Sequence, residues 1–150
     1  MPQSFSCLHT HIIFSTKNRA PFLVPELIKP LYAYIGGIVR QRKCQLIRIG
    51  GIQDHVHLLV RQARDISVSD LVGPIKSVSS GWVHDEYPQY QGFAWQQGYA
   101  AFSVSLSGLE SVGAYIENQE EHHRRKTYKE ELIEFLERHE IEYDEKYMWD

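Results

Sequence analysis

The order in which strand-like and helix-like segments follow one another constrains the fold of this chain more than any other feature of the sequence. Short runs rich in β-branched and aromatic residues favour strands, and apolar residues recurring every three or four positions favour helices. Strand patterns cover residues 6–16, 45–49, 55–61 and 93–105, and helix patterns cover residues 25–42, 67–84, 109–124 and 128–139. Taken in chain order, the six segments between residues 6 and 105 alternate as strand, helix, strand, strand, helix, strand. This order predicts an α+β fold, a ferredoxin-like or RRM-like antiparallel sheet (βαββαβ) with helices on one face and a C-terminal helical extension.

Local signals refine the ends of these elements. Ser67 or Ser69 is expected to cap the second helix, and Thr127 to cap the last one. Gly50-Gly51 is expected to form a flexible connection inside a hairpin, and residues 93–105 form either one bent strand or two short ones. The second face of the sheet is expected to be open, which would make it a platform for single-stranded nucleic acid.

Size and composition are those of one globular domain, and we expect residues 1–150 to fold as a unit. No apolar run approaches the roughly 20 residues of a membrane span, and no signal peptide pattern opens the sequence, so we expect a cytoplasmic protein. Cys7 and Cys44 belong to no motif and are expected to be reduced thiols.

Charge is divided unevenly along the chain. Residues 1–64 carry nine basic and two acidic side chains, a net charge of +7, whereas residues 65–150 carry seven basic and seventeen acidic ones, a net charge of −10. A basic half can attract a phosphate backbone although the whole chain has a net charge of −3. An ordinary solvated surface is the alternative explanation of this asymmetry.

His55 and His57 lie two residues apart and alternate with the apolar residues Val56 and Leu58. Successive side chains of a strand point to opposite faces, so both imidazoles are expected to share one face while Val56 packs on the other. Ordinary strand histidines are common, and His9 and His11 have the same spacing on another strand. We interpret this second pair as packing residues or as residues that support the site from behind.

Tyr115 and Gln119 lie four residues apart in a helical pattern, so a phenol and an amide oxygen are expected on one helix face. His122 and His123 follow and either could face the same site, although solvated histidines are the simpler interpretation. Two imidazoles, one more ligand oxygen and a hydroxyl group are the parts needed for metal-assisted attack on a phosphodiester.

These motifs together resemble a known family. His55-Val56-His57 resembles the His-hydrophobic-His signature of HUH nucleases, and Tyr115-x-x-x-Gln119 resembles the nucleophile and third metal ligand of the single-tyrosine transposases of small bacterial insertion sequences and their REP-associated relatives. The opening strand with residues 17–19, and the segments 75–80 and 95–99, are similar to that family as well. The resemblance covers nearly the whole chain.

The resemblance implies a DNA transposase that cuts and rejoins single-stranded DNA. His55, His57 and Gln119 would hold Mg²⁺ or Mn²⁺, and Tyr115 would attack the scissile phosphate to give a covalent 5′-phosphotyrosine and a free 3′-hydroxyl. It also implies a homodimer in which the tyrosine helix of one subunit can complete the histidine site of the other, with Gly108 and Gly113 as places where that helix could pivot.

Family members recognise a DNA hairpin, which implies further contact residues. Lys17, Arg19 and Lys76 are the candidates for contacts with the DNA backbone, and Trp95 and Tyr99 are the candidates for stacking on bases. A buried core position is the favoured alternative for Trp95. The acidic segment after Glu130 should repel DNA, so we expect it to pack away from the binding face or to limit non-specific binding.

Three other interpretations remain open at this stage. The chain could be a non-catalytic single-stranded nucleic-acid-binding module on a ferredoxin-like sheet, or an HUH replication initiator or relaxase, although those usually belong to longer chains. It could also be a domesticated relative that cleaves DNA without moving an element. A structural zinc domain is disfavoured because the sequence offers no cluster of four Cys or His ligands.

Overall fold

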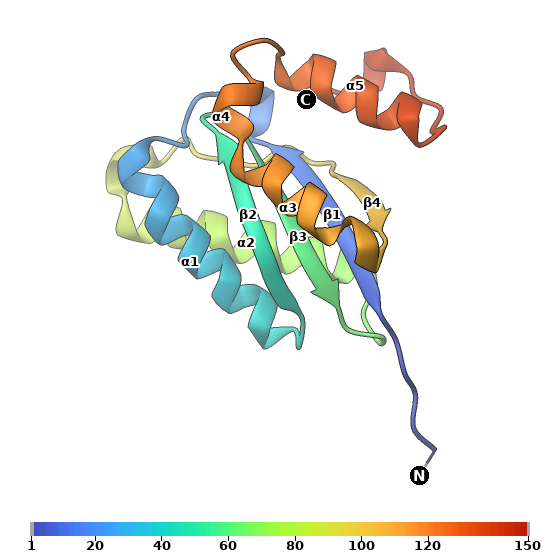
Figure 1. Cartoon of the computed structure of the whole chain (residues 1–150). Helices are drawn as coiled ribbons and strands as arrows, with labels where there is room; N and C mark the ends of the chain where they lie inside the picture. Colours follow the sequence, from blue (N-terminus) through green and yellow to red (C-terminus); the bar gives the residue numbers. More distant parts are fainter. Residues whose placement is uncertain (1, 150) are drawn as a thin grey trace.

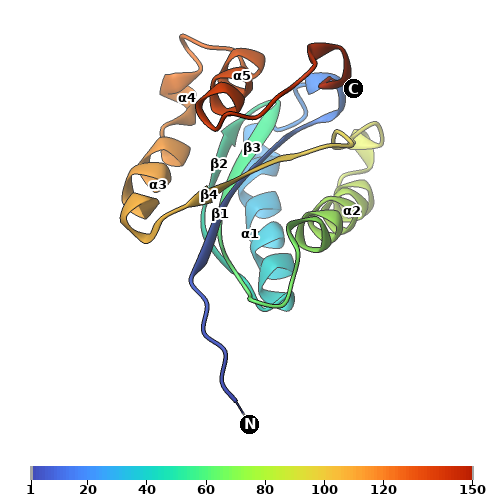
Figure 2. The same cartoon turned by 90° about the vertical axis from the view of Figure 1, so that its right-hand side faces the viewer.

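The computed structural model describes residues 2–149 as a four-stranded antiparallel sheet with helices on both faces (Figures 1 and 2). The strands are β1 (Leu8–Ser15), β2 (Gln45–Ile52), β3 (His55–Gln62) and β4 (Ala100–Val104). The α-helices are α1 (Pro25–Gln41), α2 (Val68–Glu86), α3 (Leu109–Glu117), α4 (Gln119–His122) and α5 (Tyr128–Arg138). Short 3₁₀ turns cover Lys17–Arg19, Pro88–Tyr90, Leu106–Gly108 and Glu145–Tyr147.

The strands lie in the order β2-β3-β1-β4. This order, with α1 and α2 as the two crossover helices on one face, confirms the predicted ferredoxin-like fold. Side chains of Ser67 and Thr127 accept hydrogen bonds from backbone N–H groups three residues ahead, so the predicted caps of α2 and α5 are confirmed.

The main core lies between the sheet and the helices α1 and α2. Alternate residues of the two central strands point into it, and they meet apolar stripes of both helices. The fully buried members are Ile12 and Phe14 of β1, Val56, Leu58 and Val60 of β3, Leu27, Leu31, Ile35 and Val39 of α1, and Leu71, Ile75 and Val83 of α2. Burying each such side chain contributes roughly 1.5–3 kcal/mol, so this face dominates the stability of the domain.

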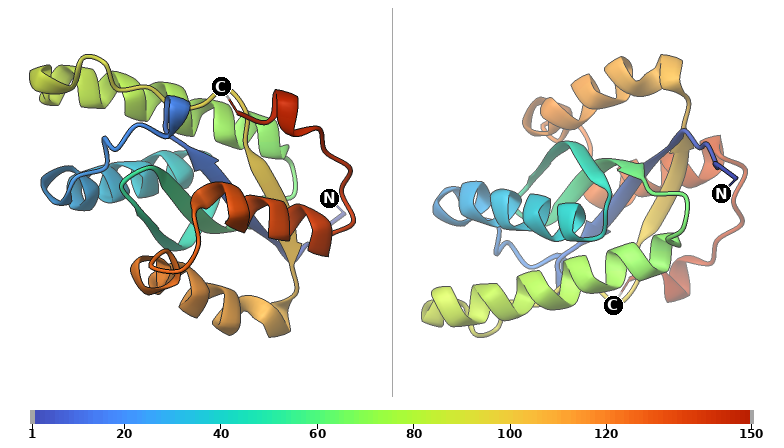
Figure 3. Two further views of the ribbon diagram at one scale, coloured as in Figure 1. Left: turned by 90° about the horizontal axis from the view of Figure 1, so that it is seen from above. Right: turned by 90° about the horizontal axis from the view of Figure 1, so that it is seen from below.

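The second face of the sheet is not open, and that expectation is wrong. The helices α3 and α5 lie over it, as the view from above shows (Figure 3). Ile13 and Phe102 of the sheet pack there against Leu132 and Leu136 of α5 in a second, smaller apolar cluster. The helical extension therefore covers the strands whose outer side chains were expected to meet nucleic acid.

Gly50 and Gly51 do not form the flexible connection that their sequence indicated. Both lie in β2, which continues to Ile52, and a two-residue turn then leads into β3. A Cβ atom on Gly50 would overlap the backbone carbonyl oxygen of Ile116 in α3. Glycine is needed here because a helix backbone approaches the strand closely, not because the chain turns.

Two segments are shorter than their patterns predicted. Of residues 93–105 only β4 is a strand, and Trp95 adds a single bridge to Thr16. The helix predicted over residues 109–124 breaks at Asn118, whose φ of −99° and ψ of 26° end α3 before α4 begins. The break places α4 beside the turn between β2 and β3 (Figure 1).

Both thiols, exposed Cys7 and buried Cys44, are free, as predicted. Among residues 2–149 no helix combines the length and the hydropathy that crossing a bilayer requires.

Candidate functional site: a cluster of histidines, a glutamate and a tyrosine

His55 and His57 point together to the face of β3 that α4 and α5 cover, as the strand alternation predicted. Both side chains are completely buried, and their ring centroids lie 5.1 Å apart. In the register of the sheet Ser15 and Ile13 of β1 lie opposite them. The sheet thus fixes the backbone positions of both imidazoles from two sides.

Three imidazoles are oriented by hydrogen bonds to one of their two ring nitrogens. Nδ1 of His55 lies 2.7 Å from Oδ1 of Asp54, and Nδ1 of His57 lies 2.8 Å from Nε2 of His11. Nδ1 of His123 lies 2.7 Å from the backbone oxygen of Lys126. Partners of this kind commonly fix the tautomer of a metal-ligating histidine, because they leave the Nε2 lone pair for the ion.

The Nε2 atoms of these three histidines converge on one carboxylate oxygen. Oε1 of Glu131, in α5, lies 3.2 Å from His55, 3.0 Å from His57 and 3.2 Å from His123. The amide oxygen of Gln119 lies 3.1 Å from Nε2 of His55 and 2.9 Å from Nε2 of His123. Five side chains from β3, from α4 and its following turn, and from α5 therefore meet at one buried point.

The donor set fits a divalent metal ion. The ligand atoms of His55, His57, His123 and Glu131 all lie within 4.8 Å of one another. Nitrogen and oxygen atoms that share one ion at about 2.0–2.2 Å are separated by roughly 4.4 Å at most, so a small contraction would bring these atoms to bonding distance. Imidazole nitrogens together with a carboxylate oxygen are common ligands of first-row divalent metals.

Burial and hydrogen bonding shift the pKa of each group in the cluster in opposite directions. Burial alone would raise the pKa of Glu131, but the hydrogen bonds from His123, His55 and His57 outweigh it and hold that pKa well below the usual range. Burial lowers the pKa of His55, but Asp54 and Glu131 together raise it to about 9. Burial dominates at His57, whose pKa falls to about 4.

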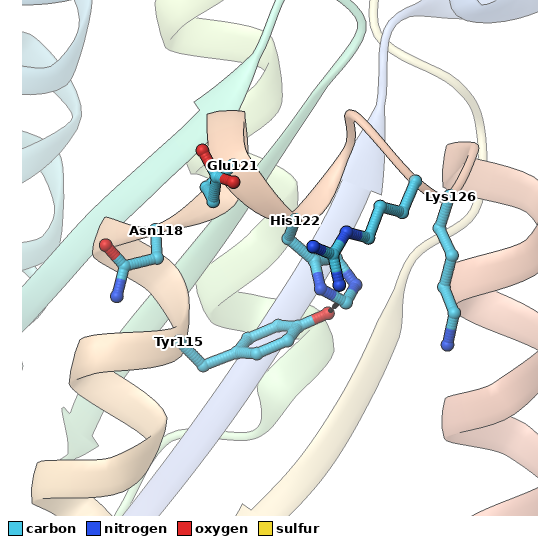
Figure 4. Close-up of a pocket in the computed structure, with 6 residues that line it drawn as sticks. Tyr115, Asn118, Glu121, His122 and Lys126 are labelled. Carbon is cyan, nitrogen blue, oxygen red and sulfur yellow. Dashed lines mark hydrogen bonds between the residues drawn. The ribbon is translucent and has the colours of Figure 1, made fainter.

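The hydroxyl group of Tyr115 reaches the same cluster. It donates a hydrogen bond to Oε2 of Glu131 and lies 3.0 Å from Nε2 of His122, a contact that Figure 4 shows. Its ring centroid lies 5.8 Å from that of His57 in the same chain. Burial, followed by the neighbouring Glu131 carboxylate, raises the pKa of Tyr115 well above its ordinary value of about 10, so the phenol is neutral.

Tyr115 also faces solvent-accessible space on its outer side. A pocket of about 680 Å³ adjoins its ring and is lined by Tyr115, Asn118, Glu121, His122, Arg125 and Lys126 (Figure 4). A second pocket of about 310 Å³ is also lined by Tyr115 and includes Lys126 and Arg138. Both basic and acidic side chains line this space, namely Arg125, Lys126 and Arg138 with Glu121 and Glu134.

The five residues predicted to contact DNA lie in different environments. Lys17 is exposed, whereas the guanidinium of Arg19 lies 5.5 Å from the ring centroid of Trp149. Nζ of Lys76 donates hydrogen bonds to the backbone oxygens of Gln96, at 2.8 Å, and Gly98. Tyr99 is 41% exposed.

Trp95 belongs to the core instead. It packs between Phe14 and Phe93 at centroid distances of 4.9 and 5.0 Å, and its Nε1 donates to the hydroxyl oxygen of Ser79 at 3.0 Å. Its burial is the alternative that the sequence favoured, and the side chain has no face left for a base.

Glu131 was missed from the sequence, and the acidic segment after Glu130 does not pack away from the site. Residues 128, 132 and 136 form the apolar stripe of α5, and Glu131 lies beside that stripe. A charged residue on the buried side of an amphipathic helix rarely occurs without a partner. This position on α5 is the sequence feature that could have identified Glu131 as a site residue. His11 is placed behind His57, as the interpretation of the second histidine pair expected.

A buried cluster of three histidines and a glutamate on a ferredoxin-like sheet offers ligand atoms for a metal ion beside a tyrosine hydroxyl group, and the comparison with known families identifies the class of protein. Residues 4–119 match the model of the family described as IS200-like transposase. The chain belongs to this family, and it is a DNA transposase, as the motifs predicted.

Known relatives agree with this assignment. The ISDra2 transposase TnpA of Deinococcus radiodurans is 29% identical over 117 residues, which cover 75% of this chain and 84% of that protein. A crystal structure of a transposase from Deinococcus radiodurans R1 superposes with a TM-score of 0.65 at 27% identity, covering 79% of this chain and 98% of the other.

A more distant structure shares the fold. It is a REP-associated tyrosine transposase bound to a REP hairpin, with a TM-score of 0.61 at 14% identity, and it covers 82% of this chain and 73% of the other. The helix α5, with Glu131, lies beyond the residues that the family model matches.

Proposed function

We propose that this transposase cuts and rejoins single-stranded DNA through a covalent 5′-phosphotyrosine, with Tyr115 as the nucleophile and His55, His57 and Gln119 as metal ligands. One observation carries the proposal. The Tyr115 hydroxyl and the Nε2 atoms of the histidines contact the two oxygens of one buried carboxylate, so nucleophile and ligands meet within a single chain. The whole chain, residues 1–150, would act as one transposase domain.

The metal is Mg²⁺ or Mn²⁺, and the donor set favours Mn²⁺, because imidazole nitrogens are better ligands for a first-row transition metal than for Mg²⁺. Bound there, the cation would polarise the scissile phosphate and lower the pKa of the neighbouring phenol. Asp54 and His11 would support this role by holding the Nδ1 atoms of His55 and His57.

The chemistry assigned to Tyr115 is a transesterification. Its oxygen forms a bond to phosphorus while the bond from phosphorus to the 3′ oxygen breaks. The phenol proton, which points to Oε2 of Glu131, passes by way of that carboxylate to water, and the leaving 3′ oxygen takes up a proton from water. Attack by a 3′-hydroxyl on the phosphotyrosine reverses these changes and releases the tyrosine. Each step replaces one phosphate ester bond by another, so the bond energy is conserved and rejoining needs no ATP.

The proposed DNA contacts are those that the family resemblance implies, without the buried Trp95. Lys76 would have to release the backbone oxygens of Gln96 and Gly98 to reach DNA. Lys17, Arg19 and Lys76 would bind the backbone and Tyr99 would stack on a base, while Trp95 takes no part. A hairpin is the proposed form of the substrate, and a REP-associated transposase of the same fold is bound to one. A protein that acts on chromosomal DNA of a bacterium or archaeon would work in the cytoplasm.

The protein is proposed to act as a homodimer. In the single chain Tyr115 already lies beside its own His57, which supports use of the tyrosine within its own subunit. A composite site would require α3 to leave this position and swing to the partner, with Gly108 at the start of the moving segment.

Covalent capture of DNA tests the proposal. The protein is incubated with a single-stranded DNA hairpin bearing flanking sequence and Mn²⁺, then run on a denaturing gel. We expect a band of DNA linked to protein that disappears in Tyr115→Phe and is kept in the control Tyr147→Phe, since that side chain is 77% exposed and outside the cluster. A band that persists in Tyr115→Phe would reject the tyrosine, and a wild-type protein that only binds would favour the non-catalytic module.

A further inference from the structure

Glu131 is the most completely buried carboxylate of the site, with a side chain only 1% exposed. Removing a carboxylate from water is costly unless charged or hydrogen-bonding partners compensate it. Four imidazoles and one phenol surround this group, and the distances divide them between its two oxygens. Oε1 faces the Nε2 atoms of His55, His57 and His123, whereas Oε2 faces the hydroxyl of Tyr115 and, at 3.5 Å, His122.

This division of contacts is that of a bridging group. One oxygen lies where the Nε2 atoms of three histidines converge, and the other accepts the hydrogen bond of the Tyr115 hydroxyl. The position is held by the remainder of α5. Leu132 and Leu136 pack on the sheet beside Ile13, and the side chain of Thr127 caps the helix three residues before Glu130.

We propose that Glu131 is a further ligand of the metal and positions Tyr115, with Oε1 on the ion beside the histidines and Oε2 on the tyrosine hydroxyl. The segment beyond the family-matched residues is then part of the active site, and docking of α5 completes it. The proposal rests on the proposed function for the identity of the nucleophile, but the ligand role of Glu131 stands independently of that identity.

The first test is metal affinity without any reaction. Full-length wild-type protein and the variant Glu131→Gln are titrated with Mn²⁺ by isothermal titration calorimetry. We expect the dissociation constant to rise at least about tenfold in Glu131→Gln, because an anionic ligand is replaced by a neutral amide. Glu130→Gln is the matched control, since it makes the same change of charge on the exposed neighbour, and its affinity should stay within about twofold.

The opposite result would overturn the proposal. If Glu131→Gln binds Mn²⁺ as tightly as wild type, or more tightly, then the carboxylate merely fills the centre of the cluster in the metal-free protein and leaves when the ion enters. Wild-type protein that binds no Mn²⁺ would overturn it equally.

A second measurement uses only wild-type protein and therefore does not depend on the folding of a variant. Hydrogen exchange is followed with and without saturating Mn²⁺. If Glu131 binds the ion, amides of residues 128–138 exchange more slowly with Mn²⁺, while amides in the middle of α2 do not change. Faster exchange in residues 128–138, or no change, would show that the ion displaces or ignores α5.

These results are separable from the covalent capture assay. Weaker Mn²⁺ binding by Glu131→Gln together with an adduct that survives in Tyr115→Phe would uphold the ligand role and reject the proposed nucleophile. A Tyr115-dependent adduct together with unchanged Mn²⁺ binding by Glu131→Gln would uphold the proposed function and reject the inference.

Discussion

The two faces of the central sheet differ although the same strands build both. In β3, Val56 and Leu58 point to α1 and α2 and are surrounded by apolar side chains, whereas His55 and His57 point to α4 and α5 and are surrounded by polar ones. All four are completely buried. The comparison shows that burial has two uses here. On one face it stabilises the fold, and on the other it encloses a cluster of polar side chains, where each buried polar group requires a partner.

The largest expected effect on stability comes from the apolar face. Leu58→Ala should lower the free energy of unfolding by about 2–5 kcal/mol, because it removes buried methyl groups and leaves a cavity. Urea unfolding followed by circular dichroism measures this change. The Mn²⁺ affinity of the folded fraction should stay close to that of wild type, and a loss of affinity as large as that of a histidine variant would contradict the division between the faces.

The neighbouring residue should behave in the opposite way. His57→Ala is expected to weaken Mn²⁺ binding at least about tenfold, because one converging nitrogen is removed. His9→Ala is the matched control, since His9 lies outside the cluster on the neighbouring strand β1, where it contacts Cys7. Calorimetric titration compares them, and equal losses in both variants would show that the two histidine pairs are not distinct.

A smaller effect is expected where α3 meets the sheet. Gly50→Ala should destabilise the fold by about 1–3 kcal/mol, because the added methyl group collides with the backbone carbonyl oxygen of Ile116 and forces α3 away. Thermal unfolding measures it, with Gly73→Ala as a control because open space surrounds that position. If both variants unfold at the wild-type temperature, the close approach of α3 is wrong.

The smallest effect concerns the cap of α5. Thr127→Ala should cost about 1 kcal/mol of stability, because the N–H of Glu130 loses its side-chain acceptor. If α5 must dock to complete the site, the same variant should also weaken Mn²⁺ binding by a few-fold in calorimetry. Unchanged Mn²⁺ binding would show that the cap of α5 does not affect the site. Ser67→Ala is the control, because it removes the cap of α2 and should leave Mn²⁺ binding unchanged.

Local patterns in the sequence predicted the fold and part of the site. Strand alternation placed His55 and His57 on one face, and helical periodicity with side-chain caps located α2 and α5. These signals are local, since they depend on residues within one or two turns of each other. They were sufficient for the order of elements and hence for the topology of the sheet.

The remaining features depend on contacts between distant segments, for which a local pattern has no signature. From the sequence alone Gly50 is interpreted as a turn residue, because its close contact with Ile116 is visible only in the structure. The break at Asn118 and the docking of α5 over β1 likewise follow from packing on the second face. The sequence gives Glu131 only as one of several acidic residues in the last helix. Its contacts with three imidazoles come from distant segments, so its place in the site could be found only from the structure.

The most direct test of the central claim is to locate the covalent bond. After incubation with single-stranded DNA and Mn²⁺, the DNA-linked protein is digested with protease and nuclease, and mass spectrometric fragmentation identifies the residue that carries the nucleotide. The account predicts a nucleotide on the oxygen of Tyr115, formed with Mn²⁺ and absent when the metal is chelated. A nucleotide on another residue, or an adduct that forms equally well in chelator, would contradict it.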